Sequence, residues 1–394
     1  MTPAARLQAA IEIVDQVIVA TRDGGAAADT LIKRYFKTRR YAGSGDRRAV
    51  RELVYAAIRR SGKRPPGGRA ALIGLASEMP GLAAQFDGSP HGPPPIGDDA
   101  IVAEDGGLPK WLRRSFAAEL TDEDVASLSG RAPLDIRVNL SRISRDEALA
   151  QLDGAETGQY SDRALRLPQG YPLEQHALWT NGAIDIQDEG SQLVADACEA
   201  KPGQLIVDLC AGAGGKTLAL WDRTAGKARL IACDTDRGRL SRLPGRARRA
   251  HMEGIVTRLL DPGRESEAFG DLAGRADGVL VDAPCSGAGT WRRNPEARWR
   301  LTPDRLAGHR SEQARLLDIA AELVAPGGNL VYAVCSLLAD EGSTQISAFL
   351  SRHSAFRKEE PAIDAAIASG AGYLLTPARH GTDGFFFARL LRSC

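Results

Sequence analysis

The sequence has no long hydrophobic run. No stretch is long and apolar enough to cross a bilayer, which excludes a membrane-spanning helix. The first residues, MTPAARLQAAIEIVDQ, also lack the apolar core and the cleavage site of a secretory signal. We therefore expect a cytoplasmic protein. Its 394 residues, of which 43% are hydrophobic, are enough for two or three domains.

The sequence also lacks the cysteine spacing of a zinc site. Six cysteines stand at positions 198, 210, 233, 285, 335 and 394, and no two of them form a CxxC pair. A disulfide framework is not expected in a chain of this size without a secretion signal. We expect no metal, and for most of these cysteines simple burial at the ends of apolar runs.

The charge balance is close to neutral. A formal net charge of +1 indicates no partner by itself, but basic residues crowd the segment from Lys33 to Arg69, where only Asp46 and Glu52 oppose them. They are Lys33, Arg34, Lys37, Arg39, Arg40, Arg47, Arg48, Arg51, Arg59, Arg60, Lys63, Arg64 and Arg69. Such local asymmetry predicts a phosphate-binding surface for RNA, with a solvated helical face as the alternative.

A second basic stretch contains tryptophans. It comprises Trp291, Arg292, Arg293, Arg298, Trp299 and Arg300. Stacking and charge together favour a clamp on a single RNA strand. Packing of the two tryptophans inside a loop is the alternative interpretation.

Hydropathy and turn residues divide the chain into four parts. Residues 1–85 are expected to form a helical bundle, because Val50, Leu53 and Ile58 share one helical face. Residues 86–107 are rich in proline, glycine and aspartate and read as a linker. Residues 108–175 are expected to form a small α+β module. Residues 176–394 form the last part.

Strand-like runs and helical patterns alternate in this last part. The apolar runs are Leu205–Leu209, Leu230–Cys233, Val256–Leu260, Gly278–Val281 and Asn329–Val334. Near-continuous apolar strands that alternate with helices predict an α/β fold with a doubly wound, mostly parallel sheet.

A glycine-rich turn follows the first of these strands and opens a helix. Its residues are Cys210, Ala211, Gly212, Ala213, Gly214, Gly215 and Lys216. Glycines allow close approach of a ligand, which could be a dinucleotide, a nucleotide phosphate or S-adenosylmethionine. A Walker-type loop is disfavoured, because that motif needs a glycine where Cys210 stands.

Three acids lie at the ends of successive strands. Asp234 can accept hydrogen bonds from ribose hydroxyls, and Asp261 could meet an adenine edge, although either residue could instead cap a helix. Asp282 ends the fourth strand. Carboxylates along the carboxyl edge of an open α/β sheet predict a nucleoside pocket.

The same edge receives two cysteines, Cys285 in Asp282-Ala-Pro-Cys-Ser-Gly and Cys335 at the end of the next strand. Reactive cysteines favour such partly exposed positions. Carbon 5 of cytosine is a poor nucleophile until a thiolate adds to carbon 6. The two cysteines are therefore suited to methylation at carbon 5. Asp282 is placed to stabilise the adduct. An amino-methyltransferase would carry an Asn/Asp-Pro-Pro-aromatic tetrapeptide at this position instead.

Several motifs occur together and in order. They are Asp185-Ile-Gln-Asp-Glu-Gly-Ser-Gln192, the Cys210–Thr217 loop, Asp282-Ala-Pro-Cys-Ser-Gly287, Cys335-Ser336 and His380-Gly-Thr-Asp-Gly-Phe-Phe386. From about Leu108 onward the chain thereby resembles the Sun/Nol/Nop (RsmB-like) family of RNA (cytosine-5) methyltransferases. Two departures are Ala213, where the family usually has proline, and Val334, where threonine is common.

The resemblance implies roles for these residues. The cysteine that matches Cys335 is the family's nucleophile, and the one that matches Cys285 assists product release. The loop and the acids that match Asp234, Asp261 and Asp282 hold S-adenosylmethionine. It also implies a Rossmann-like methyltransferase domain at residues 176–394 and an RRM-like module at 108–175.

The N-terminal helices resemble a shortened NusB-like RNA-binding domain, through Arg51-Glu-Leu-Val-Tyr-Ala-Ala-Ile-Arg59. This resemblance favours 16S rRNA as the substrate. We also expect a monomer, with no metal and no membrane partner. A tRNA cytosine-5 methyltransferase stays open as the alternative. So does a non-catalytic RNA-binding assembly factor, although the intact cysteines oppose it. A NAD-dependent dehydrogenase would need a proton-relay histidine or tyrosine at the sheet edge.

Overall fold

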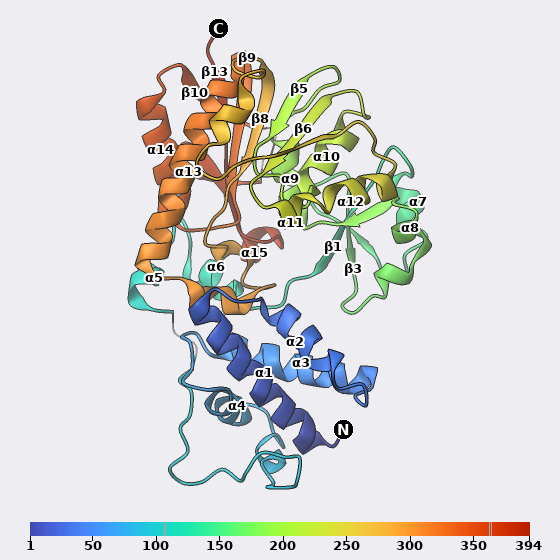
Figure 1. Cartoon of the computed structure of the whole chain (residues 1–394), viewed down its shortest axis with the longest axis vertical. Coiled ribbons are helices and arrows are strands. Elements are labelled where there is room, and N and C mark those ends of the chain that lie inside the picture. Colours follow the sequence, from blue (N-terminus) through green and yellow to red (C-terminus); the bar gives the residue numbers. More distant parts are fainter. Residues whose placement is uncertain (106–107, 362, 364) are drawn as a thin grey trace. The chain divides into compact units, whose positions relative to one another are not determined.

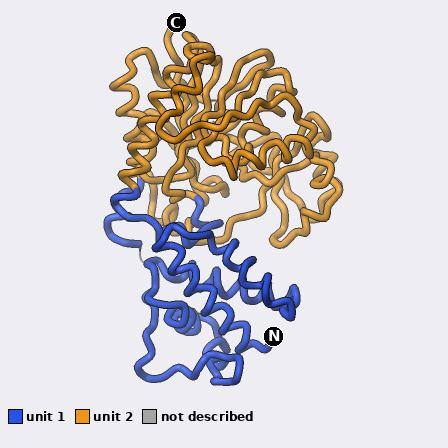
Figure 2. Tube along the Cα trace, viewed as in Figure 1, with its two compact units in different colours: residues 1–116, 290–305 blue, residues 117–289, 306–394 orange. Residues whose placement is uncertain are grey.

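The computed structural model describes residues 1–105, 108–361, 363 and 365–394. The chain divides into two compact units, which Figure 2 colours separately. The first unit comprises residues 1–116 and 290–305, and the second comprises residues 117–289 and 306–394. A short segment from the C-terminal half of the chain therefore belongs to the N-terminal unit.

The first unit is helical. Its helices are α1 (Pro3–Asp23), α2 (Ala28–Lys37), α3 (Ser44–Arg60), α4 (Gly68–Ala76) and α5 (Lys110–Arg114), with the 3-10 turns η1 (Ala83–Gln85) and η5 (Pro295–Arg300) (Figure 1). The predicted apolar face of α3 is confirmed, because Val50, Val54 and Ile58 are fully buried. Between η1 and α5 the described residues contain no helix or strand.

The segment at residues 290–305 completes the core of the first unit. Trp299 lies in the same buried cluster as the helices, and its Nε1 donates to the carbonyl of Ser61 (2.9 Å). Arg298 donates to the carbonyls of Ile58 (2.6 Å) and Arg59 (2.7 Å) at the end of α3. Carbonyls in the last turn of a helix have no partner within that helix, so Arg298 satisfies two of them.

The expected RNA clamp in this segment is therefore wrong. Trp291 and Trp299 are 1% and 6% exposed, and Arg298 is 5% exposed. Side chains packed inside a helical core cannot stack on a base. The alternative interpretation, tryptophans packed within the protein, is the correct one.

The second unit is built around a nine-stranded sheet. Its strands are β5 (Leu205–Asp208), β6 (Arg229–Asp234), β7 (Val256–Leu259), β8 (Ala276–Asp282), β9 (Val324–Val334), β10 (Phe356–Glu359), β11 (Ile367–Ser369), β12 (Gly372–Leu375) and β13 (Phe385–Arg392). The order is β11-β12-β13-β9-β8-β5-β6-β7, with β10 against β13. Strands β5 to β9 pair in parallel and the remaining pairings are antiparallel.

The five predicted strands are all present, and the predicted fold class is confirmed: this is a Rossmann-like, doubly wound sheet. Its helices are α9 (Glu189–Asp196), α10 (Gly215–Arg223), α11 (Arg237–Leu240), α12 (Leu243–Ala250), α13 (Pro303–Leu323), α14 (Ser343–Arg352) and α15 (Pro377–His380), with the 3-10 turns η3 (Glu265–Phe269), η4 (Ala288–Thr290) and η6 (Ala339–Glu341). Residues of α9 and α10 pack with β5, β6, β8 and β9 in one buried cluster. Alternation of strand and helix places all the parallel strand ends at one edge.

A smaller four-stranded sheet, of order β2-β3-β1-β4, precedes the large one. Its strands are β1 (Leu134–Val138), β2 (Glu156–Thr157), β3 (Ala164–Leu167) and β4 (Ile184–Ile186). The helices α6 (Asp122–Ser127), α7 (Arg145–Leu149) and α8 (Ala177–Thr180) and the turn η2 (Leu173–Gln175) accompany it. Strand β4 pairs antiparallel with β1, so the small sheet takes one strand from beyond residue 175.

Candidate active site

A pocket of about 350 Å³ opens at the carboxyl edge of the large sheet. Its walls come from the ends of β5, β6 and β8, from Cys335 after β9, and from α13. The lining residues are Leu209, Cys210, Asp234, Thr235, Asp236, Arg239, Leu260, Glu265, Asp282, Ala283, Pro284, Cys285, His309, Glu312, Leu316 and Cys335. The structure thus brings the two cysteines together with three of the predicted cofactor residues, Cys210, Asp234 and Asp282.

The glycine-rich loop is tied to the end of β6. Gly212 (φ 56°) and Gly214 (φ 84°) adopt left-handed conformations that favour glycine, and Gly214 precedes α10. The Gly212 amide donates to Asp234 Oδ2, and the Asp236 amide donates to Asp234 Oδ1, each at 2.7 Å. Asp234 therefore fixes the loop while its carboxylate borders the pocket.

Two further bonds link α10 to the strand ends. Lys216 Nζ donates to Asp282 Oδ2 (2.7 Å). Burial disfavours the charged form of Lys216, but the nearby negative groups, with Asp282 the largest among them, together outweigh burial and raise the lysine pKa. Thr217 Oγ1 donates to Asp208 Oδ2 (2.6 Å). Burial raises the pKa of Asp208 to about 7, and its Oδ1 has no partner among the described residues.

Cys285 and Cys335 come from neighbouring strands and meet in the pocket. Their Sγ atoms lie 3.4 Å apart, which is hydrogen-bond distance for sulfur. The hydrogen bond to Cys335, together with burial, raises the pKa of Cys285 well above its ordinary value. Cys285 is therefore a neutral thiol at neutral pH.

A buried carboxylate joins the loops that carry the two cysteines. Glu341 is fully buried, and its Oε1 accepts from the Ser286 amide (2.8 Å). Its Oε2 accepts from the hydroxyl of Ser336 (2.6 Å). Gln313 donates to Glu341 Oε1 (3.2 Å) and to the carbonyl of Pro284 (3.0 Å). These hydrogen bonds hold in place the residues next to Cys285 and Cys335, and so they position both cysteines.

Other predicted residues lie outside the pocket lining. Asp261 is exposed and stands two residues beyond β7. The loop residues from Ala211 to Lys216 support the pocket and are not part of its lining. Their assignment to the cofactor stays a prediction.

Several residues of the pocket could not be predicted from the sequence. His309, Glu312 and Leu316 lie on α13 at spacings of three and four, so they share one helical face. That spacing is visible in the sequence, but nothing in it indicates which face of α13 meets the strand ends. Glu341 was missed because its role depends on contacts with residues distant in sequence.

No group of metal-binding side chains is present among the residues that the structure describes. Over the same residues, no helix is long and apolar enough to pass through a membrane.

The site fits an adenosyl cofactor. A carboxylate stands at the end of the second parallel strand, where ribose hydroxyls would bind, and a glycine loop leads into a helix start. The pocket continues from this acid to the two sulfur atoms. Fold and site together define a Rossmann-like, S-adenosylmethionine-dependent methyltransferase.

Comparison with known proteins identifies the family. Residues 195–391 match the family model described as 16S rRNA methyltransferase RsmB/F. The chain is 35% identical over 300 residues to ribosomal RNA small subunit methyltransferase B of Xanthomonas campestris, covering 74% of this chain and 68% of that one. The corresponding protein of Shewanella oneidensis is 34% identical over 295 residues, covering 73% and 67%. The chain belongs to the RsmB/F methyltransferase family.

The fold is shared along the whole chain with one solved protein. The crystal structure of PH0851 superposes with a TM-score of 0.77 at 24% identity and covers 99% of both chains.

The family match confirms the predicted family, enzyme class and cofactor: the chain is an S-adenosylmethionine-dependent methyltransferase of the rRNA-modifying kind. The matches span about two thirds of the length of the curated relatives.

Proposed function

We propose that this enzyme methylates carbon 5 of a cytosine in 16S rRNA through a covalent cysteine adduct. The observation that carries the proposal is the pair of thiols, 3.4 Å apart, at the sheet edge that also holds the cofactor pocket. S-adenosylmethionine supplies the methyl group. The protein supplies the activation of the base, which would otherwise be too weak a nucleophile.

Cys335 is assigned the attack. Its thiolate sulfur forms a bond to carbon 6 of a cytosine taken out of its stack, and the electron pair of the 5,6 double bond makes carbon 5 nucleophilic. Carbon 5 then gains the methyl group while it still carries its proton. Loss of that proton restores the double bond, and the carbon–sulfur bond breaks to return the Cys335 thiolate.

Cys285 is assigned the removal of the carbon 5 proton. The largest cause of its raised pKa is the hydrogen bond to Cys335. Once the sulfur of Cys335 is bonded to carbon, it can no longer accept this hydrogen bond as a thiolate, which removes the largest of the causes that raise the pKa of Cys285. We therefore assign Cys285 the role of base after the adduct has formed, whereas its neutral thiol does not compete as a nucleophile before that step.

Asp282 is assigned the stabilisation of the adduct. Lys216 holds one of its oxygens, which leaves the other for the ring nitrogen of cytosine. Asp234 and the loop of residues 210–216 are assigned to the cofactor, Asp234 through the ribose hydroxyls. Asp261 keeps its assignment to the adenine edge, which needs a test because the residue is exposed.

The helical domain predicted at residues 1–85 is assigned to RNA binding, and residues 290–305 are added to it because they pack in its core. The predicted linker at 86–107, RRM-like module at 108–175 and methyltransferase domain at 176–394 otherwise stay predictions, with β4 added to the small module. An rRNA substrate places the enzyme in the cytoplasm, and we propose a monomer. The relatives named as ribosomal RNA small subunit methyltransferase B favour 16S rRNA over tRNA.

Bisulfite sequencing of total RNA tests this function. A strain that lacks the gene should lose one 5-methylcytosine from 16S rRNA, and the cloned gene should restore it. Loss of the mark from a tRNA instead would support the alternative substrate. Unchanged 5-methylcytosine in all RNAs would overturn the proposal.

A further inference from the structure

The motif Asp185-Ile-Gln-Asp-Glu-Gly-Ser-Gln192 contributes no residue to the lining of the active-site pocket, and the proposed chemistry gives it no role. Its first residue, Asp185, lies on β4 of the small sheet and is 6% exposed. A carboxylate buried this deeply needs hydrogen-bonded or charged partners. Its partners lie on α12, a helix that packs with the large sheet.

Two arginines of α12 share the Asp185 carboxylate. Arg246 Nη2 donates to Oδ2 (2.5 Å), and Arg249 Nη2 donates to Oδ1 (2.7 Å). The Arg249 guanidinium also lies over the Trp179 ring of α8, with its carbon 3.6 Å from the ring centre. Each oxygen of the buried carboxylate thus has its own cationic partner.

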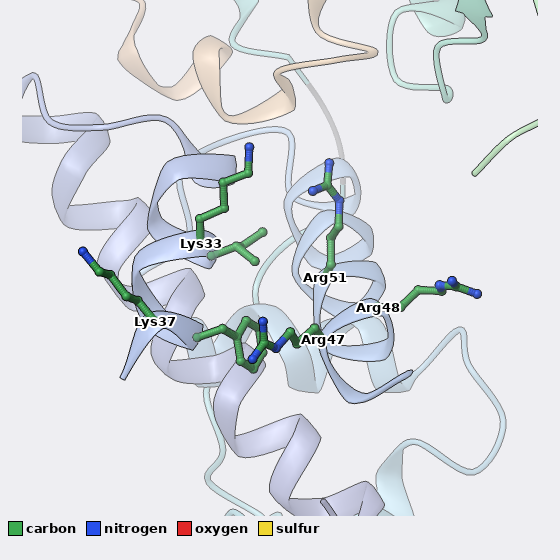
Figure 3. Close-up of a pocket in the computed structure, with 7 residues that line it drawn as sticks. Lys33, Lys37, Arg47, Arg48 and Arg51 are labelled. Carbon is green, nitrogen blue, oxygen red and sulfur yellow. The ribbon is translucent and has the colours of Figure 1, made fainter. Parts of the chain in front are cut away.

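These two arginines differ from basic side chains of the first unit. Lys37 and Arg48, on α2 and α3, are exposed and extend outward in Figure 3. The side chains of Arg246 and Arg249 are only 26% and 22% exposed. Their charges are therefore committed to a partner inside the protein.

Arg246 also reaches the glycine-rich loop. Its Nη1 donates to the carbonyl of Ala213 (2.8 Å). Arg249 holds the same carboxylate but makes no hydrogen bond to this loop within the described part of the chain. Two nitrogens of one planar guanidinium group therefore join β4 to the loop that leads into α10.

The loop rests on α12 at a second point. A Cβ atom at Gly214 would come within 2.1 Å of Leu243 Cδ1, so the backbone of the loop lies directly against this helix. Leu243 and Ala247 of α12 belong to one buried cluster with Ala211 and Leu218, which stand on either side of the turn. The position of α12 therefore sets the position of the loop.

The contact from Arg246 fixes the orientation of one peptide group. The Ala213 carbonyl and the Gly214 amide belong to the same planar peptide. The Gly214 N–H donates to the Ala211 carbonyl (2.8 Å), and Arg246 holds the carbonyl of the same peptide. The next peptide groups open α10, and the first N–H groups of a helix have no partner within it and can bind a ligand. The orientation of this peptide therefore decides where those N–H groups point.

We propose that Arg246 is a positioning residue for S-adenosylmethionine: it holds the loop in its binding conformation through the Ala213 carbonyl, and Asp185 holds Arg246. The inference rests on the proposed function, in which the loop of residues 210–216 binds the cofactor. Neither Arg246 nor Asp185 lines the pocket, so their effect reaches the cofactor through the loop. The small sheet thereby contributes to cofactor affinity through β4.

The test compares variants of the full chain that differ in one side chain of α12. Arg246→Met removes the donors to Ala213 and Asp185 and keeps an unbranched side chain. Arg249→Met is the matched control, because it takes the same charge from the same carboxylate without a loop contact. Arg248→Met, at an exposed residue of the same helix, controls for charge alone. Isothermal titration calorimetry with S-adenosylmethionine measures affinity, and methyl transfer at saturating RNA gives the KM for the cofactor and kcat.

Arg246→Met should weaken cofactor binding about tenfold, the loss expected for one charge-assisted hydrogen bond. The KM for the cofactor should rise by the same factor, while kcat at saturating cofactor stays within about twofold of wild type, because the reacting groups are unchanged. Arg249→Met and Arg248→Met should stay within about threefold of the wild-type affinity. Asp185→Asn combined with Arg246→Met should bind the cofactor no more weakly than Arg246→Met alone, since both act through one chain of contacts.

Equal weakening by Arg246→Met and Arg249→Met would show that only the attachment of β4 to α12 matters, and it would overturn the proposal. Unchanged affinity in Arg246→Met would overturn it too, as would a fall in kcat without a rise in KM. If Arg246→Met does not fold, Arg246→Lys replaces it, because lysine keeps the charge but has one nitrogen to serve two partners. Arg246→Lys should raise the KM for the cofactor at least about threefold, and a wild-type KM would overturn the proposal.

Cofactor binding and methyl transfer separate this inference from the proposed function. If the wild type binds S-adenosylmethionine but transfers no methyl group to cytosine in RNA, the proposed function fails, and the comparison of affinities still tests Arg246. If the wild type methylates cytosine and Arg246→Met binds the cofactor as tightly as wild type, only the inference fails.

Discussion

The hydroxyls of Ser286 and Ser336 lie 3.2 Å apart, and each serine directly follows one of the two cysteines of the pocket. Glu341 accepts hydrogen bonds from both. The Glu341 carboxylate therefore holds the two cysteine-bearing loops next to each other, although Glu341 itself lies in the 3-10 turn η6.

Glu341→Gln should reduce kcat by about 10- to 100-fold, since an amide cannot accept from every donor that surrounds this carboxylate. The charge of Glu341 is also one cause of the raised pKa of Cys285. Its removal should therefore shift the pH profile of product release toward lower pH. Asp340→Asn is the control, because Asp340 is a neighbouring acid outside the network. An unshifted profile with a lowered kcat would reduce Glu341 to a purely structural role.

Asp234→Ala should weaken binding of S-adenosylmethionine at least about tenfold, or roughly 1.4 kcal/mol, with little effect on RNA affinity. The reason is twofold, since Asp234 both borders the pocket and fixes the Gly212 amide. Isothermal titration calorimetry measures the change. Asp261→Ala is the comparison, and we expect less than about a threefold effect for this exposed residue. Equal losses in both variants would place the adenine edge at Asp261 after all.

Asp208→Asn should stabilise the protein, and more so at pH 8 than at pH 5.5. Burial raises the pKa of Asp208 from 3.8 to about 7. The folded protein is therefore most stable, with respect to this carboxyl group, below pH 3.8, and that stability is lost as the pH rises from 3.8 to about 7. The asparagine variant avoids this loss. The gain over wild type should grow by roughly 2 kcal/mol between the two pH values in urea unfolding, because wild-type Asp208 loses stability from pH 5.5 up to its folded pKa of about 7. A gain independent of pH would contradict the assignment.

Much of the second unit could be predicted from the sequence. Continuous apolar runs mark buried parallel strands, and parallel strands bring their carboxyl ends to one edge, so Asp234, Asp282 and the two cysteines were expected to meet. The local pattern could not show that α13 contributes His309 and Glu312, because the helix offers several polar faces.

The segment at residues 290–305 shows the opposite case. Arginine and tryptophan side by side are typical of nucleic-acid contacts. Here, however, the guanidinium of Arg298 donates to carbonyls at the end of α3, and Trp299 packs in the helical core. Composition alone does not distinguish a buried partner within the protein from an RNA partner outside it.

Trp299→Ala should therefore destabilise the helical unit by about 3 to 5 kcal/mol, as expected for a large core side chain with a buried hydrogen bond. Urea unfolding followed by circular dichroism measures this loss. An unchanged midpoint would mean that the segment only rests on the unit and does not complete its core.

The covalent mechanism is tested most directly by comparing Cys335→Ala and Cys285→Ala on denaturing gels after incubation with substrate RNA and S-adenosylmethionine. Cys285→Ala should accumulate a protein–RNA adduct that survives denaturation, because methyl transfer proceeds but the carbon 5 proton is not removed. Cys335→Ala should form no adduct and no 5-methylcytosine, because the ring is never activated. An adduct in Cys335→Ala alone would reverse the two roles, and full activity in both variants would contradict the cysteine chemistry altogether.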